Sequence, residues 1–161
     1  MQSPLTIETV TNTVEMLDLS YWVSPDSAGV LVPFGPTDEH AGYDVILEID
    51  GNVLSSRIVP KDLEELAVAD PGAVLAICNL WNRAHRWPTA VFEAVPRPFL
   101  LGNLNQHFAV APTPEQLLAS IELPLATGAA FVRFLVRLVG QGGLALDDEA
   151  LSSLLDIDDA A

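Results

Sequence analysis

Residues 43–59 carry the pattern that most restricts the fold of this chain. In Tyr43–Ile49, every second residue is apolar and lies on one face of the expected strand. The residues between them, Asp44, Ile46 and Glu48, lie on the other face. The Asp50-Gly51 pair that follows is a strong hairpin signal, so Val53–Val59 is expected to return antiparallel. The pattern predicts an antiparallel sheet with one buried face and one wetter face.

The rest of the chain predicts an order of helix, four strands, helix, two strands, helix and tail. The other expected strands are 20–23, 29–34 (joined by a turn at 25–28), 89–95 and, after a turn at 96–98, 99–110 with a bulge or break at Gly102-Asn103. Helices are expected at 4–18, 61–67 and 71–86, with a weak one at 146–157. A further helix begins at the capping box 113–116, and Pro124 is expected to kink or split it, so that its second piece is 125–139. This order is typical of an α+β fold, an antiparallel sheet of hairpins with helices packed on it.

Length and charge set the domain organisation and exclude several partners. The 161 residues suit one domain, expected at 1–143, followed by an acidic tail at 144–161. The net charge is −15, distributed as −11 over 1–70, +2 over 71–146 and −6 over 147–161. We therefore expect no nucleic-acid partner and no membrane surface as a partner.

The N-terminus and the hydropathy pattern bear on location. The first 56 residues contain no Lys or Arg, so a signal peptide's basic region is missing. The longest uncharged run, 98–114, holds three prolines and several amides, and no segment is expected to span a bilayer. The expected location is the cytoplasm.

The helix expected at Leu125–Val139 is more apolar than a helix with one face on a core requires. Its charges, Arg133 and Arg137, define a narrow polar stripe, and the apolar arc is roughly twice the usual 100°. Either the helix is buried inside the monomer, or the excess is covered by the tail, a second subunit or a client. The second alternative predicts a partner or dimer interface at Val132, Phe134, Val136 and Val139.

Other residues with chemical potential are better explained without catalysis. Cys78 and His85 share a helix face but lack the further ligands of a metal site, and no orienting group completes a nucleophile. The acidic groups 147–149 and 156–159 do not match a calcium loop, and Gly140–Gly143 lacks the lysine of a phosphate loop. The sequence predicts no cofactor, no metal site and no enzyme.

The run Asn79-Leu80-Trp81-Asn82, followed by Trp87-Pro88, is the most distinctive motif. With the helix start at Thr113, Glu115 and Leu117 and a last helix containing Phe131 and Phe134, it resembles the YbjN family of bacterial sensory-transduction regulators, in an actinobacterial-type version. The resemblance implies a small acidic fold like that of type III secretion chaperones, often dimeric and without catalytic residues. It implies structural roles for the motif residues Asn79, Trp81, Asn82, Trp87 and Pro88.

Two functions follow from these observations. The first is a non-catalytic protein-binding module, chaperone-like or regulatory, acting as a homodimer or a paralogous heterodimer and holding a protein client. The alternative is a sensor of a small anionic molecule, or a small enzyme. Its pocket would lie between the 71–86 helix and the sheet, lined by Trp81 and Trp87, with Arg83 or Arg86 contacting the anion.

Overall fold

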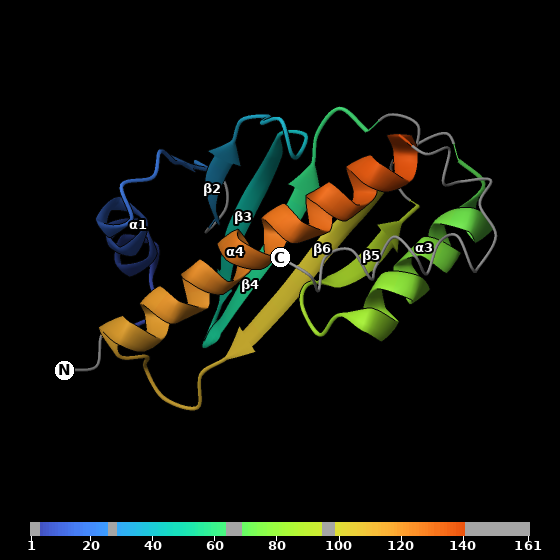
Figure 1. Ribbon diagram of the computed structural model, residues 1–161. Coiled ribbons are helices and arrows are strands. Elements are labelled where there is room, and N and C mark those ends of the chain that lie inside the picture. The colour runs from blue at the N-terminus through green and yellow to red at the C-terminus, as the bar shows by residue number, and fades with distance from the viewer. Residues whose placement is uncertain (1–3, 26–28, 64–68, 95–98, 141–161) are drawn as a thin grey trace.

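The computed structural model describes residues 4–25, 29–63, 69–94 and 99–140, which form an antiparallel sheet with helices on it (Figure 1). The described strands are β1 (Trp22–Val23), β2 (Gly29–Phe34), β3 (Tyr43–Asp50), β4 (Val53–Pro60), β5 (Thr89–Glu93) and β6 (Phe99–His107). The described helices are α1 (Ile7–Met16), α3 (Pro71–Ala84) and α4 (Pro114–Gly140). The predicted α+β class is confirmed.

The six strands form one sheet in the order β1-β2-β3-β4-β6-β5, and every neighbouring pair is antiparallel. The predicted hairpin is confirmed, because Asp50 pairs with Val53 across a two-residue turn. Gly51 occupies that turn with φ +57, a left-handed conformation that glycine adopts without steric cost.

The three helices cover one face of the sheet, as Figure 1 shows. α4 crosses β3, β4 and β6, α1 lies beside β2 and against α4, and α3 lies beside β5. The core lies between these helices and the inward strand residues, among them Val45, Leu47 and Ile58, each with no exposed surface. Phe131, Phe134, Leu135 and Leu138 fill it from α4.

The predicted starts of α3 and α4 are confirmed. The Thr113 hydroxyl accepts from the Gln116 N–H at 3.2 Å, and Gln116 Oε1 accepts from the Thr113 N–H at 2.9 Å. Asp70 caps α3 by accepting from the Ala73 N–H at 3.1 Å. These bonds satisfy backbone donors that the first turn of a helix leaves without partners.

Several helices and strands are shorter than predicted. α1 spans Ile7–Met16 rather than 4–18, and strands β1, β5 and β6 are shorter than 20–23, 89–95 and 99–110. α3 stops at Ala84 instead of Arg86, because His85 has extended backbone. The turn at 25–28 and the helix at 61–67 lie partly outside the described residues, and the turn at 96–98 lies wholly outside them. The glycine segment after Gly140, the tail and its expected helix at 146–157 lie outside them.

Pro124, which was expected to kink or split the last helix, does not split it. α4 runs unbroken over 27 residues with Pro124 buried inside it. A proline lacks the N–H that would bond the carbonyl four residues earlier, which is that of Ser120. Gln106 of β6 supplies the missing donor, since its Nε2 donates to the Ser120 oxygen at 2.7 Å. A side chain of the sheet thus replaces a hydrogen bond of the helix.

The predicted bulge or break at Gly102-Asn103 was also wrong. β6 pairs continuously with β4 and β5 through these residues. A Cβ at Gly102 would lie 2.7 Å from Pro88 Cγ and 3.2 Å from Phe131 Cδ1. Glycine is required there by the close approach of two side chains, while the strand itself stays regular.

The Gln106–Ser120 bond gives a double-mutant test. Gln106→Ala leaves the Ser120 carbonyl without a donor, and we expect the free energy of unfolding to fall by about 1–3 kcal/mol. In a Pro124→Ala background the substituted residue has an N–H that can bond the Ser120 carbonyl, so the loss of the Gln106 side chain should cost clearly less. Urea denaturation of the four proteins measures both costs, and equal costs in the two backgrounds would contradict the replacement.

Candidate functional site

The sheet face opposite the helices is a candidate interaction surface. Because strand side chains alternate, Val45 and Leu47 of β3 point to the core, while Asp44, Ile46 and Glu48 point to the other face. The second set is partly exposed, and no described helix covers it. The wetter face predicted from residues 43–49 is therefore this one.

One row of residues crosses this face from edge to edge. The strand register places side by side Trp22, Leu31, Ile46, Arg57, Asn103 and Thr89. The row is apolar over β1, β2 and β3 and polar over β4, β6 and β5. Trp22 and its neighbour Val23 are 61% and 45% exposed, which is unusual for side chains of this size.

A hollow of about 430 Å³ lies over the apolar part of the row. Its lining includes the residues that we call the open-face patch, which are Trp22, Val23, Leu31, Ile46, Glu48 and Arg57. Sequence reasoning did not select these residues for a site. The signal was present in the adjacent Trp22-Val23 pair and in Ile46, an apolar residue on the polar side of an alternating strand.

Two ion pairs lie on this face. Arg57 donates to Glu48 Oε2 at 2.6 Å, and Lys61 forms an ion pair with Asp44. Glu48 and Arg57 are each about one-third exposed, so the pair adds only about 0–1 kcal/mol to stability. Its larger consequence is that this part of a strongly acidic chain is locally neutral.

The edge strands are poor templates for a further strand. The side chain of Asn82 bonds both backbone groups of Ala90 in β5, at 2.7 Å to the N–H and 3.0 Å to the carbonyl. At the other edge β1 has two residues, and Pro33 of β2 has no N–H to donate. A partner is therefore more easily accommodated on the open face than along an edge.

The motif residues around Trp81 hold α3 to the sheet. Trp81 is 1% exposed, donates from Nε1 to the Pro88 carbonyl at 2.7 Å, and contacts the rings of Phe131 and Phe134. Pro88 is buried and Trp87 half-buried, whereas Asn79 is exposed on α3. The contacts of Trp81 and Asn82 are those that a structural role requires.

The interface expected on the last helix needs correction for two residues. Val132 and Phe134 have no exposed surface in a single chain, and Phe134 packs against Trp81 of α3, so neither side chain is available to a partner in this fold. Val136 and Val139 are partly buried against the core. The buried-helix alternative accounts for most of the apolar arc.

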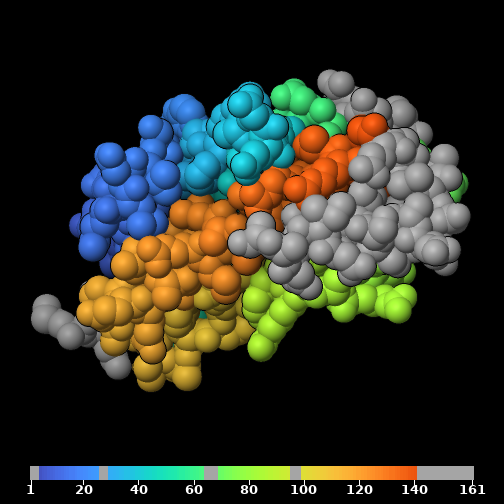
Figure 2. Space-filling view, viewed as in Figure 1, coloured from blue at the N-terminus to red at the C-terminus, as the bar shows by residue number. Residues whose placement is uncertain are grey.

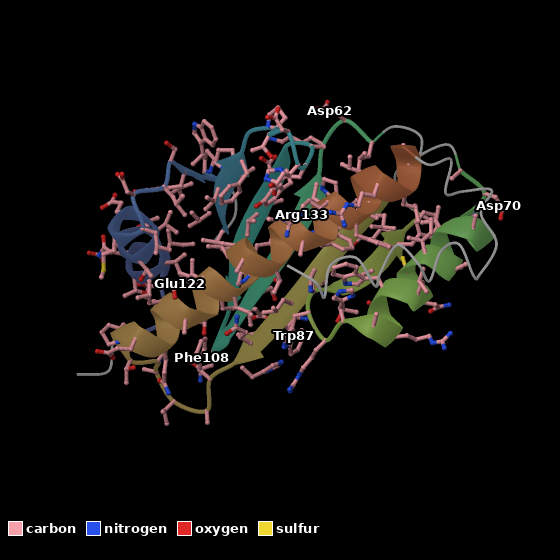
Figure 3. The ribbon with its side chains drawn as sticks, viewed as in Figure 1. Asp62, Asp70, Trp87, Phe108, Glu122 and Arg133 are labelled. Carbon is pink, nitrogen blue, oxygen red and sulfur yellow. The ribbon has the colours of Figure 1, made fainter. Side chains whose placement is uncertain are left out.

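The structure bears on one lining residue of the alternative pocket near the Trp81 helix. Trp81 is packed between His85, stacked at 3.7 Å, and the phenylalanines of α4, and it is 1% exposed, so it offers almost no surface to a ligand. Arg86 lies 5.6 Å from the centre of the Trp87 ring (Figure 3 labels Trp87). Arg83 lies in the last turn of α3, where a cation stabilises the negative end of the helix.

No group of three metal-ligating side chains occurs among the residues that the structure describes. Cys78 is 4% exposed, and burial raises the pKa of its thiol to about 11. The thiol is therefore protonated at neutral pH, and the nucleophilic form of a cysteine is the thiolate.

The length of α4 corrects the expectation that no segment could cross a membrane. The helix has 27 residues and contains an 18-residue window with a mean hydropathy of 1.5, so it is long and apolar enough by length and composition alone. The sequence pattern had divided this helix at Pro124. In the fold, Phe131, Leu135 and Leu138 of α4 have no exposed surface and form the core, as expected of a core helix.

The fold and its surfaces define an α+β protein with one helix-covered and one open sheet face. A family model described as "Putative bacterial sensory transduction regulator", YbjN, matches residues 6–137. The chain therefore belongs to the YbjN family, as the Trp81-Asn82 motif indicated. Membership supports a regulatory, non-catalytic role in general.

A solved structure shares the fold. The crystal structure of YbjN from E. coli, described as "a putative transcription regulator", matches with a TM-score of 0.61 at 11% identity. The match covers 88% of this chain and 96% of that chain. Among the curated proteins no match was found.

The buried thiol gives a pH prediction. At pH 8 the thiolate fraction of Cys78 in the folded chain should be about a hundred-fold below that of an exposed thiol of pKa 9, and burial slows attack further. The rate of alkylation of the folded chain should rise with pH up to about 11. Reaction with iodoacetamide in buffer and in urea measures this, and equal rates would contradict a protonated, buried thiol.

Proposed function

We propose that the chain is a regulator that acts by binding protein, and that it works as a homodimer through the open-face patch. The observation that carries the proposal is the exposure of Trp22 and Val23 beside a hollow on the sheet face that no described helix covers. Exposed apolar patches rimmed by polar residues mark interaction sites in folded proteins. The expected cytoplasmic location stays a prediction from the sequence.

Charge favours a second copy as the occupant. Two chains of net charge −15 repel each other over most of their surface. The open face is different, because Glu48 and Arg57 form a neutral pair of opposite charges there. In a two-fold interface each patch faces its own copy, so the carboxylate of one chain can approach the guanidinium of the other.

The size of the face is compatible with a dimer. Six strands about 4.8 Å apart and about 20 Å long give a face on the order of 600 Å². A standard interface buries about 800 Å² on each partner. Trp22 lies toward one edge of this face, on β1, and a tryptophan buried in an interface is a typical source of binding energy.

Replacing Trp22 tests the proposal. Light scattering behind size exclusion should show the full-length chain as a dimer at micromolar concentration. Trp22→Asp places a charge on the patch and should weaken the dimer at least ten-fold. Trp22 packs little against its own chain, so circular dichroism and the melting temperature of the diluted monomer should hardly change.

Leu75→Asp is the matched control. Leu75 is 50% exposed on α3, on the helix-covered side, and its replacement should leave the dimer intact. A chain that is monomeric at all accessible concentrations would overturn the proposal, as would equal weakening by both variants.

A further inference from the structure

A second hollow lies on the helix-covered side of the molecule, away from the open-face patch. It has a volume of about 520 Å³ and is lined by Leu17, Leu19, Phe34, Glu122, Leu125 and Ala126. Figure 3 labels Glu122 on α4, where this helix passes α1. We call these six residues the acidic groove.

The floor of the groove is apolar and reachable from solvent. The α1 helix ends at Met16, and Asp18, with φ 55, turns the chain away toward β1. Leu17 and Leu19, on either side of Asp18, remain only partly buried, as do Phe34 and Leu125. Ala126 is exposed on α4, and its small side chain leaves the space above these residues open.

The segments that build the groove are acidic throughout. Residues 4–25 contain three acids, 29–42 two and 114–128 two, and none of these stretches contains Lys or Arg. Glu122 is exposed and lines the groove, and Asp18 is exposed between the lining residues Leu17 and Leu19. Farther along α4, Arg133 is paired with Glu39 at 3.0 Å, so that cation is already engaged. Figure 2 shows the face on which these segments meet.

We infer that the acidic groove binds a basic amphipathic segment of another protein. Apolar side chains of that segment would lie on Leu17, Phe34 and Leu125, and its lysines or arginines would approach Asp18 and Glu122. The inference follows from charge complementarity between an apolar groove with an acidic rim and a partner of the opposite charge. It goes beyond the homodimer, because it uses a different surface and does not require the open-face patch.

The probe is a fluorescein-labelled helical peptide of leucine and lysine with one apolar face, added to the full-length chain. Fluorescence anisotropy should show saturable binding that weakens as salt rises. The matching leucine and glutamate peptide should not bind, and a leucine and lysine peptide with scrambled order should bind at least ten-fold more weakly. Equal binding of the scrambled peptide would mean nonspecific attraction and would overturn the inference.

Replacing carboxylates by amides of the same shape tests whether the negative charges at the rim of the acidic groove contribute to peptide binding. The double variant Asp18→Asn, Glu122→Gln removes two charges with little change of shape and should weaken peptide binding roughly three- to ten-fold. Asp62→Asn is the control, since Asp62 is exposed near the end of β4, away from the groove (Figure 3). Asp62 and Asp18 both have φ near +55, which asparagine tolerates.

Ala126→Gln tests the floor without changing any charge. The longer side chain should fill the space over Leu125 and weaken binding at least five-fold. Ala119→Gln, at another exposed position of α4, should have little effect. Binding that resists Ala126→Gln, or falls equally with both glutamines, would overturn the groove as the site. Because the peptide assay can be run on Trp22→Asp, its result is independent of whether the chain dimerises.

Discussion

The packing of α4 across β3, β4 and β6 is the interaction on which the rest of the structure depends. Phe131 and Phe134 of this helix carry no exposed surface and contact Trp81, which fixes α3 beside β5. The helix continues through Pro124 because Gln106 of the sheet bonds the carbonyl that the proline leaves free. With α1 and α3 beside α4, all described helices lie on one face, and no described helix covers the other face of the sheet.

The successes of sequence reasoning came from local rules. The alternation in Tyr43–Ile49 identified both faces of the sheet, and the caps at Asp70 and Thr113 follow from the donors that a helix start must satisfy. The errors came from contacts between distant residues. Pro124 was expected to kink or split α4. The local sequence does not show that Gln106, which is distant along the chain, replaces the lost hydrogen bond.

The same limit applies to Gly102 and to the apolar excess of α4. Glycine in a strand suggests a bulge, but here it makes room for Pro88 and Phe131, which come from other parts of the chain. The apolar arc correctly indicated that more than one element covers α4, and the covering elements at Phe134 are the sheet and α3. Trp22 was missed because a two-residue strand carries almost no periodic signal.

The two sides of this small domain have opposite physical characters. The open-face patch is neutral because Glu48 and Arg57 pair there, and the groove beside α1 is apolar with an acidic rim. The neutral patch is the surface that we expect a second copy to cover in solution. Hydroxyl-radical footprinting of the full chain over a range of concentrations tests this directly. Oxidation of Trp22 should fall as the concentration rises, while that of Met16, which is 75% exposed on the helix side, should stay constant. Constant oxidation of Trp22, or protection that appears instead at Val136 and Val139, would contradict a dimer formed through the open face.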